Sequence, residues 1–277
     1  MTIPAKNLVL FASRVLVRSR NRNCTETRDW GDRTGFTYFN PPFDPTEVEA
    51  FLSLREEQNM PVMGPDIDKS AMIIVDMQND FLHPDGAFAQ RAREQPEKKI
   101  DMAFLASVIP NVKRLAAAFR EAGRPVVYIA QVLKPDYSDA AFPYWKGWSE
   151  RKASFLFEGT RGAQIIDELT PGKGEHLIVK KGYSGFSNTP LDTLLRNLGV
   201  STCVVTGVTT YVCVSSTVRG AVECNYRVVL VKDAVAEVSR EAHEAELETI
   251  ARVFGDVKSA DEVIKTLASS SRLAVAD

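Results

Sequence analysis

The sequence has few histidines and cysteines and no excess of either charge. None of its three histidines, His83, His176 and His243, follows a predicted strand beside a partner, which argues against a Cys–His catalytic pair. The four cysteines form no C-x-x-C pair and no secretory signal is recognisable, so we expect reduced thiols in a cytoplasmic protein. The net charge of −2 gives no electrostatic reason to expect nucleic acid or an anionic membrane as a partner.

Long apolar runs are also absent. The N-terminal stretch before Ser13 and Arg14 has about six apolar residues, which is too short for a signal peptide or a membrane span. Elsewhere no run approaches the roughly 18 residues of a transmembrane helix. We therefore expect no membrane partner.

The composition that remains is that of a globular protein, with 44% hydrophobic and 25% charged residues. A length of 277 residues fits one α/β domain with an extension. Residues 1–65 carry Arg-rich and Gly/Asn/Pro-containing stretches, followed by a short predicted helix from Pro45 to about Glu57. We interpret them as an N-terminal extension that covers a sheet edge or wraps a neighbouring subunit, and residues 66–277 as the main domain.

Five short apolar runs predict strands, the first of which should be buried on both faces. They lie at residues 71–75, 126–130, 176–179, 203–206 and 227–231. Helical spacing of apolar residues occurs at 111–122, 189–198, 212–223, 241–253 and 261–267. This alternation predicts an α/β fold with a three-layer α-β-α Rossmann-like parallel sheet of about five or six strands and helices on both faces.

Chemically active side chains follow three of these strands. Asp76 comes directly after the first, Lys180 after the third, and Cys213 in the turn and helix after the fourth. Ligands of such sheets bind at the carboxyl ends of the strands, where an acid, a cation and a thiol would converge. Each signal alone has an ordinary alternative: a helix-capping carboxylate, a surface lysine with Lys181 as competitor, or a small buried thiol. Nearby Asp80 is better explained as a turn or capping group.

Cys213 is the cysteine best placed for catalysis. It lies at about the first turn of a predicted helix, where free backbone N–H groups and the helix dipole lower the pKa of a thiol. The same N–H groups can stabilise an oxyanion. Cys203 in mid-strand and Cys224 at a helix end fit a structural role better. A thiolate nucleophile, a carboxylate proton acceptor and a balancing ammonium together suit the attack on a carbonyl.

Three blocks of this sequence resemble the signature blocks of the isochorismatase-like cysteine hydrolases. They are VDMQNDF, VKKGYSGFSNTPLDTLLRNLGV and VVTGVTTYVCVSSTVRGAVECNYRVVLVKDA. The resemblance covers about residues 70–255 and is specific, because the three blocks occur in order at the expected strand ends. It implies that residues 66–277 form an isochorismatase-like hydrolase domain. The motifs are closest to those of ureidoacrylate amidohydrolases and N-carbamoyl or biuret-type amidohydrolases.

The resemblance implies a role for each member of the set. Asp76 matches the general base and Cys213 the nucleophile. Lys180 matches the catalytic lysine because of its place in the pattern K-x-x-Y-S-[AG]-F. The resemblance further implies a cis peptide bond between Val208 and Thr209, and an oxyanion hole made by the backbone N–H groups of Thr209 and Cys213.

Departures from the patterns of the family narrow the expected chemistry. Nicotinamidases of the family carry an Asp-x-His metal motif after the second strand, where this sequence has Ile129, Ala130 and Gln131. We therefore expect no metal and no cofactor. True isochorismatases lack the cysteine, so Cys213 argues against vinyl-ether hydrolysis. The prediction is a metal-independent cysteine amidohydrolase that cleaves a C–N bond of a small ureido, carbamoyl or amide compound through an acyl-enzyme.

Two alternatives stay open. One is a nicotinamidase-type or maleamate-type amidase that acts on a plain carboxamide. The other is a non-catalytic family member that serves as a binding or scaffold subunit. The intact set of Asp76, Lys180 and Cys213 argues against this second alternative. The resemblance also implies a homodimer or homotetramer with a small-molecule substrate.

Three further residues are candidates for substrate contact. Gln131 follows the second strand and has an amide that suits a ureido group, while Phe81 and Tyr183 flank the expected catalytic residues. A loop glutamine and two packing aromatics are the alternatives. The long aromatic-rich segment 134–158 is a candidate lid, with core or subunit contact as the alternatives.

Overall fold

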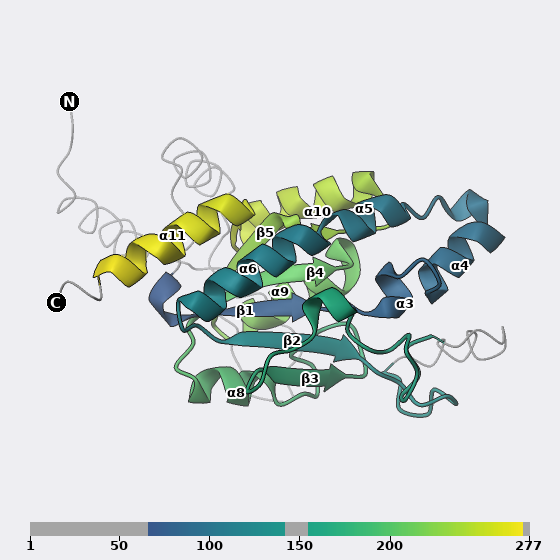
Figure 1. Ribbon diagram of the computed structural model, residues 1–277, viewed down its shortest axis with the longest axis horizontal. Helices are drawn as coiled ribbons and strands as arrows, with labels where there is room; N and C mark the ends of the chain where they lie inside the picture. The colour runs from purple at the N-terminus through teal and green to yellow at the C-terminus, as the bar shows by residue number, and fades with distance from the viewer. Residues whose placement is uncertain (1–65, 142–154, 274–277) are drawn as a thin grey trace, which may run out of the picture. The chain divides into compact units, whose positions relative to one another are not determined.

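The structure is a computed structural model that describes residues 66–141 and 155–273 (Figure 1). The predicted extension, residues 1–65, lies outside the described residues and stays a prediction. The same holds for residues 142–154, the larger part of the candidate lid.

One sheet of six parallel strands forms the centre of the fold, in the order β3-β2-β1-β4-β5-β6. The strands are β1 (Ser70–Val75), β2 (Val126–Gln131), β3 (His176–Lys180), β4 (Thr202–Val208), β5 (Arg227–Ala236) and β6 (Asp256–Lys258). The first five contain the predicted apolar runs, and the predicted fold class is confirmed. The chain turns from β1 toward β2 on one side and later reaches β4 on the other. The switch point, where ligands bind in such sheets, therefore lies beside β1.

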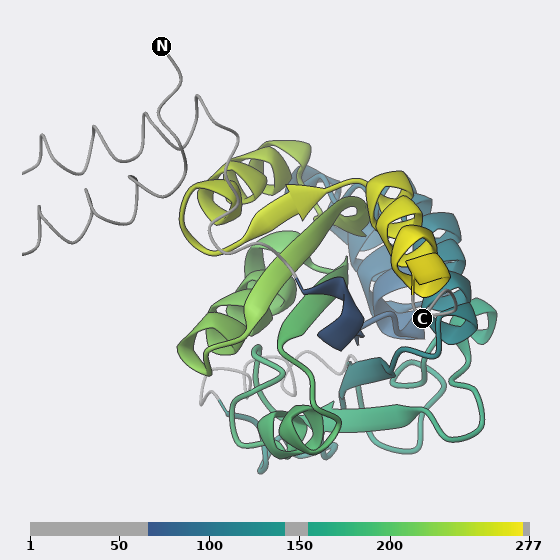
Figure 2. The same ribbon diagram turned by 90° about the vertical axis from the view of Figure 1, so that its left-hand side faces the viewer.

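Helices cover both faces of the sheet (Figure 2). One face carries α5 (Met102–Ser107), α6 (Ile109–Glu121) and α11 (Ala260–Leu273), and the other carries α8 (Leu191–Asn197), α9 (Ser215–Glu223) and α10 (Arg240–Val253). Between β1 and α5 lie α3 (Asn79–Leu82) and α4 (Ala87–Glu94). Shorter turns are η1 (Ile67–Lys69), η2 (Pro96–Lys98), η4 (Asp167–Leu169) and the π-helical η5 (Thr210–Val214).

Strand β1 supplies both cores. Met72 and Ile74 join the cluster under α6, while Ile73 and Val75 join the cluster on the opposite face. All six residues of β1 are buried, as expected for a central parallel strand. The residue that follows β1 therefore starts deep inside the molecule, which sets the burial of Asp76.

Among the described residues, Met102–Glu121 is long and apolar enough to cross a membrane by composition alone, with a mean hydropathy of 1.3. In the fold this stretch is the helix pair α5–α6. Val112 and Phe119 of α6 are buried against the sheet, whereas Lys113 and Arg114 are exposed. This amphipathic pattern is that of a helix packed on a core.

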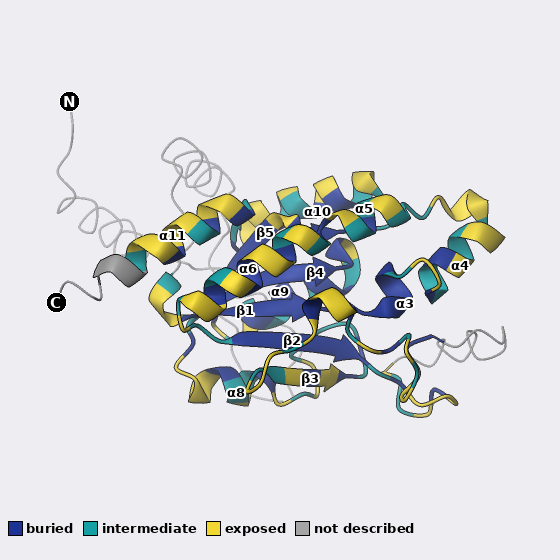
Figure 3. Ribbon diagram, viewed as in Figure 1, coloured by how far each residue is buried: buried dark blue, intermediate teal, exposed yellow. Residues whose placement is uncertain are grey.

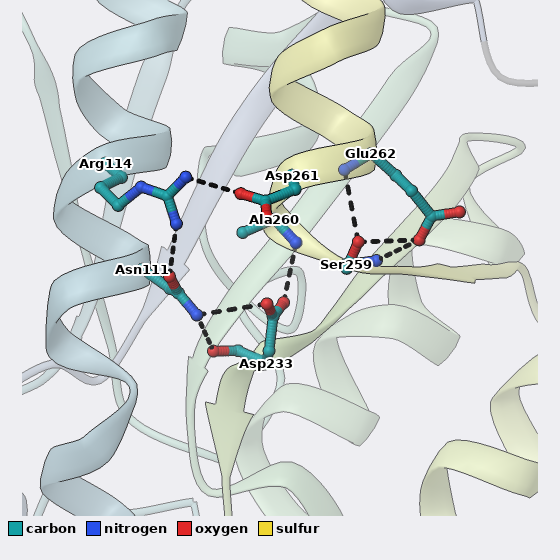
Figure 4. Close-up of polar contacts among 7 residues, drawn as sticks. All are labelled: Asn111, Arg114, Asp233, Ser259, Ala260, Asp261 and Glu262. Carbon is teal, nitrogen blue, oxygen red and sulfur yellow. Dashed lines mark hydrogen bonds and ion pairs between the residues drawn. The ribbon is translucent and has the colours of Figure 1, made fainter.

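The start of α11 is fixed by a capping box (Figure 4). The Glu262 N–H donates to Ser259 Oγ at 3.3 Å, and the Ser259 N–H donates to Glu262 Oε2 at 2.8 Å. The Ala260 N–H donates to Asp233 Oδ1 at 2.8 Å, and Asn111 donates to the Asp233 carbonyl at 2.9 Å. These bonds tie α11, β5 and α6 together.

Within the described residues, strand β3 lies at one edge of the sheet and has exposed side chains on one face (Figure 3). Leu177 and Val179 are 50% and 43% exposed. Ile178 and Lys180 alternate with them and point to the covered face, where both are buried. The alternation therefore delivers the Lys180 side chain into the interior although its strand lies at the edge.

Candidate active site

The carboxyl ends of neighbouring strands position the predicted catalytic residues. Asp76 directly follows β1, whose last residue pairs with Gly207 of β4. Gln131 at the end of β2 pairs with Lys180 at the end of β3. The chain continues from β4 into η5, which contains Cys213. The topology thus gathers the acid, the lysine and the thiol from three separate parts of the sequence.

Asp76 and Lys180 form a fully buried ion pair. Lys180 Nζ lies 2.8 Å from Asp76 Oδ2, and neither side chain is exposed. The ammonium also donates to the carbonyl oxygen of Gly182 at 3.0 Å. Cys213, which is 4% exposed, interacts with both members of the pair. The structure therefore brings all three predicted catalytic residues into one cluster.

Cys213 lies in a turn that is tied to the loop after β3. The predicted helix at 212–223 begins as the π-helical η5 and becomes α-helical from α9 onward. Such π-helical turns are frequent at functional sites. The Val208–Thr209 peptide bond is cis, as the resemblance implies. Thr217 Oγ1 donates to the carbonyl of Cys213 at 2.7 Å and accepts from the N–H of Gly185 at 3.0 Å.

The prediction of a lowered thiol pKa is wrong. Burial raises the pKa of Cys213 above the ordinary thiol value, and the nearby Asp76 raises it further, against the effect of Lys180. The position at a helix start is visible in the sequence, but the burial and the carboxylate beside the sulfur are not. Cys213 is therefore a neutral thiol at rest and needs a base to become a nucleophile.

The pKa values of Asp76 and Lys180 are shifted as well. Burial raises the pKa of Asp76, although the Lys180 ammonium and Cys213 act in the opposite direction. Burial lowers the pKa of Lys180, but Asp76 and Cys213 outweigh it and hold that pKa above the ordinary lysine value. The site thus contains a permanent ammonium and a carboxylate that accepts a proton more readily than an exposed one.

Lys181, the competitor of Lys180, has a structural position. Its Nζ lies 2.6 Å from Asp139 Oδ2 and donates to the carbonyl of Val132 at 2.6 Å. The carbonyl of Lys181 accepts from the N–H of Ala141 at 3.0 Å. This lysine, 40% exposed, fixes the segment after β2.

A buried carboxylate holds the turn before the nucleophile, and sequence reasoning missed it. Glu237 follows β5, is 4% exposed, and accepts from the N–H of Tyr211 at 2.8 Å and from the side chain of Thr209. Burial raises the pKa of Glu237, while these hydrogen bonds oppose the rise. From α10, His243 Nδ1 lies 2.9 Å from Thr210 Oγ1. His243 therefore supports the turn and takes no direct place in the catalytic cluster.

Gln131 is held in place by a second glutamine. Gln78 Nε2 donates to the carbonyl of Gln131 at 2.8 Å and to that of Ala163 at 2.7 Å. The N–H of Gln131 donates to Gln78 Oε1 at 2.9 Å. Within the described part of the chain, the side-chain nitrogen of Gln131 is buried and has no hydrogen-bond partner. Such a donor is suited to an oxygen atom of a ligand.

A cavity of about 270 Å³ opens beside Cys213. Its described lining consists of Phe81, Phe88, Arg91, Gln131, Phe155, Tyr183, Thr209, Val212 and Cys213. The predicted contact residues Phe81, Gln131 and Tyr183 are all among them. Phe88 and Arg91 of α4 and Val212 of η5 were not predicted, because no motif marks them, whereas Phe155 belongs to the candidate lid segment 134–158.

The wall of this cavity is an aromatic cluster. The ring centroids of Phe81 and Phe88 are 4.9 Å apart, and those of Phe88 and Phe155 are 5.8 Å apart in a stacked arrangement. Asp80 accepts from the N–H of Leu156 at 2.6 Å and from that of Ala87, the first residue of α4, at 3.3 Å. Asp80 is thus the capping group that the sequence indicated, and it joins the two segments that carry the wall.

A larger hollow of about 420 Å³ lies elsewhere, around the ion pair of Arg120 with Glu175. Its described lining includes none of the predicted site residues. Among residues 66–141 and 155–273 there is also no group of three His, Cys, Asp or Glu side chains arranged to hold a metal ion. The absence of a metal from the reaction stays a prediction.

Residues 70–262 match the isochorismatase domain. The ureidoacrylate amidohydrolase RutB of Pseudomonas syringae pv. syringae (strain B728a) is 33% identical over 211 residues, which cover 72% of this chain and 83% of that protein.

Two solved structures are also similar to this chain. A cysteine hydrolase from Pseudomonas syringae pv. phaseolicola 1448A has a TM-score of 0.64 at 28% identity, over 76% of this chain and 97% of that one. The N-carbamoylsarcosine amidase of Thermoplasma acidophilum has a TM-score of 0.56 at 30% identity, over 70% of this chain and 97% of that one.

Proposed function

The chain belongs to the isochorismatase family, and we propose from its site that it is a metal-independent cysteine amidohydrolase. It cleaves a C–N bond of a small ureido, carbamoyl or amide compound through a Cys213 acyl-enzyme and releases ammonia or an amine. Relatives that bear the name amidohydrolase support the hydrolysis of a non-peptide C–N bond.

One observation carries this proposal. The buried ion pair of Asp76 and Lys180 lies against Cys213, and Cys213 lines a cavity large enough for a small molecule. A buried ion pair contributes little to stability compared with apolar residues of similar size. Its position beside the one thiol of the described cavity lining is explained by proton transfer.

The reaction begins when Asp76 takes the proton of the Cys213 thiol. The sulfur attacks the carbonyl carbon, and the oxygen becomes an oxyanion that accepts hydrogen bonds from the backbone N–H groups of Thr209 and Cys213. Lys180 keeps its charge throughout, so the site is never left with an uncompensated carboxylate or thiolate.

The C–N bond then breaks. Asp76 returns the proton to the leaving nitrogen, so ammonia or an amine departs and the acyl group stays on Cys213. Asp76 next takes a proton from water, the hydroxide attacks the acyl carbon, and the thiol is restored. With a carbamoyl substrate the product is carbamate, which decays to ammonia and carbon dioxide.

The substrate is oriented by the cavity wall. The free side-chain N–H of Gln131 donates to the oxygen of a ureido or amide group, and Phe81 and Tyr183 enclose its plane. We further propose that the protein is a cytoplasmic homodimer or homotetramer without nucleic-acid or membrane partners. Light scattering coupled to size exclusion measures the assembly directly.

Ammonia release from a panel of ureides, N-carbamoyl acids and plain carboxamides tests the proposal. Cys213→Ala and Cys213→Ser should lower turnover by more than about 10³-fold. Cys224→Ala, at the end of α9, is the matched control and should keep full activity. Full activity of Cys213→Ala would contradict the proposal. Faster hydrolysis of carboxamides than of ureides would favour the nicotinamidase-type alternative.

Two further measurements examine the chemistry. Mass spectrometry of the protein quenched during turnover should show an acyl adduct on the peptide that contains Cys213. Dialysis against a chelator should leave the rate unchanged. Activity that disappears with the chelator and returns with zinc contradicts the metal-independent mechanism.

A further inference from the structure

We propose that Glu237 is a positioning residue for the reaction of Cys213, because it directs the backbone N–H of Thr209 toward the oxyanion. This inference rests on the proposed function and adds to it the side chain that orients the oxyanion hole. Glu237 is not among the described lining residues of the cavity. It therefore acts through the turn that contains Thr209 and not through contact with the substrate.

The register of two neighbouring strands places Glu237 beside this turn. Val208, the last residue of β4, pairs with Ala236, the last residue of β5. Because the two strands are parallel, the residues that follow them, Thr209 and Glu237, leave the sheet side by side. The carboxylate thus reaches the turn from the neighbouring strand, and its position does not depend on the conformation of the turn itself.

The carboxylate accepts hydrogen bonds from both ends of the turn. Glu237 Oε2 accepts from the N–H of Tyr211 at 2.8 Å, and the carboxylate also accepts from the side chain of Thr209. Glu237 Oε1 accepts from the N–H of Val238 at 2.9 Å, which fixes the carboxylate at the end of its own strand. One rigid group therefore holds the residues on either side of Thr210.

Three converging donors require a side chain that only accepts. An ionised carboxylate does so at both oxygens, whereas the amide of a glutamine would turn an N–H group toward one of the donors. Glu237 is buried, so water compensates poorly for a lost hydrogen bond. Burial raises the pKa of Glu237, and all three hydrogen bonds favour its ionised form against that rise.

Thr209 connects this carboxylate with the nucleophile. The carbonyl of Thr209 accepts from the N–H groups of Val212 at 3.2 Å and Val214 at 3.1 Å, the two neighbours of Cys213 in the chain. The side chain of Thr209 is thus held by Glu237 and its carbonyl by η5. Thr209 and Cys213 both line the cavity, so fixing Thr209 on two sides sets the direction of its N–H beside the sulfur.

The kinetic signature of this role follows from the timing of the charge. The oxyanion forms only after the sulfur has attacked the carbonyl, so a misdirected N–H weakens the transition state and leaves substrate binding unchanged. Loss of Glu237 should therefore lower kcat and kcat/KM together at a constant KM. A residue that only shaped the cavity would change KM instead.

The first test is Glu237→Gln, which keeps the size of the side chain. It should lower kcat by between about 10- and 100-fold and change KM by less than about threefold. Glu246→Gln is the matched control, since Glu246 is a buried carboxylate that accepts from Ser215 Oγ at 2.6 Å and Arg219 Nη1 at 2.7 Å, after the nucleophile. The control should keep kcat within about threefold. Equal losses in both variants would overturn the proposal.

The second test separates the oxyanion from the activation of the thiol. Iodoacetamide is attacked at its methylene carbon and loses iodide, so its reaction with Cys213 needs a thiolate but forms no oxyanion. Mass spectrometry of the peptide that contains Cys213 measures the alkylation rate. Glu237→Gln should keep this rate within about threefold of wild type while its kcat falls. An alkylation rate that falls as far as kcat would assign Glu237 to the thiol or to general packing and refute the proposed role.

The third test asks whether Glu237 acts through Thr209. Thr209→Val keeps the backbone N–H but removes the hydroxyl that donates to Glu237, so it should lower kcat by between about 3- and 30-fold. In the double variant with Glu237→Gln, the loss should be smaller than the product of the two single losses, because both remove the same contact. Losses that multiply would show that the two residues act independently.

The two levels of inference fail in different ways. If the wild type hydrolyses none of the ureides, N-carbamoyl acids and carboxamides, the proposed amidohydrolase function fails. If the wild type hydrolyses them through Cys213 and Glu237→Gln keeps the wild-type kcat, the function stands and the role of Glu237 is wrong.

Discussion

At the scale of single residues, two adjacent lysines in β3 and its following turn have opposite surroundings. Lys180 is fully buried against Asp76, whereas Lys181 is 40% exposed and paired with Asp139. Lys180→Met should lower the free energy of unfolding by about 3–5 kcal/mol, because it leaves a buried carboxylate without a partner. Lys181→Met should cost less than about 1 kcal/mol. Urea unfolding measures both, and equal losses would contradict the assignment of the buried pair.

The buried pair also predicts the pH dependence of the reaction. Asp76 acts as a base only when it is ionised, and burial raises its pKa above the ordinary value of 3.8. As the pH falls through this raised pKa, Asp76 becomes protonated and kcat/KM should fall, about tenfold per pH unit. The acid limb of the profile should therefore lie above that of an exposed carboxylate.

Lys180 provides the control for this profile. Its ammonium opposes the rise in the pKa of Asp76, so Lys180→Met should move the acid limb to higher pH. Residual activity of this variant is measured across the same pH range as that of the wild type. An acid limb that does not move, or a wild-type rate that is flat down to about pH 4, would mean that Asp76 is not the base.

The identities of the three catalytic residues could be predicted from the sequence, but their pKa values could not. Asp76, Lys180 and Cys213 follow apolar runs, and parallel strands bring their carboxyl ends to one edge. The pKa of Cys213 depends on its depth and on the charge beside it, which only the packed structure shows. Glu237 carries no motif and was found only through its contacts.

At the scale of secondary structure, Gly207 governs how closely β1 and β4 approach. Its φ of 110° lies in the region that favours glycine, and an added Cβ would collide with the backbone of Val75. Val75 and Gly207 are register partners directly before Asp76 and the turn of Cys213. Glycine at this position therefore keeps the base and the nucleophile at their mutual distance.

This arrangement predicts that Gly207→Ala separates the two catalytic residues. We expect a loss of kcat/KM of at least about 10²-fold, since misplacement by about an ångström has that effect. Gly123→Ala is the matched control: its φ is also positive, at 66°, but no atom of the described residues lies within 4 Å of the added Cβ. The control should lose about 1–2 kcal/mol of stability and keep its activity. Wild-type activity of Gly207→Ala would refute this role.

Elements differ in how well the sequence predicts them, for physical reasons. Strands of a parallel sheet tend to be continuous apolar runs, and five of the six described strands were predicted, among them β3 with its one exposed face. The sixth, β6, has three half-buried residues at the sheet edge and no such run. Helix α4 has Ala89 as its one buried residue, so its apolar face was too narrow to be recognised. The cavity wall that α4 supplies was missed for the same reason.

At the scale of the whole molecule, the described sheet and its two cores come from one continuous part of the chain. All six strands and both core clusters of the described residues come from residues 70–267. The catalytic cluster and the described lining of the cavity lie in the same range. That the extension covers a sheet edge or wraps a neighbouring subunit stays a prediction.

A chain that begins at residue 66 tests whether residues 1–65 are needed for folding and catalysis. It should unfold cooperatively in urea and keep kcat within about threefold of the full-length value, because it retains the sheet, both cores and the reacting groups. Light scattering of both forms shows whether the oligomer survives. A truncated chain that is folded, active and smaller in assembly assigns the extension to subunit contact, whereas one with an intact assembly and a changed KM assigns it to substrate access. A truncated chain that fails to fold places residues 1–65 within the domain and contradicts the boundary.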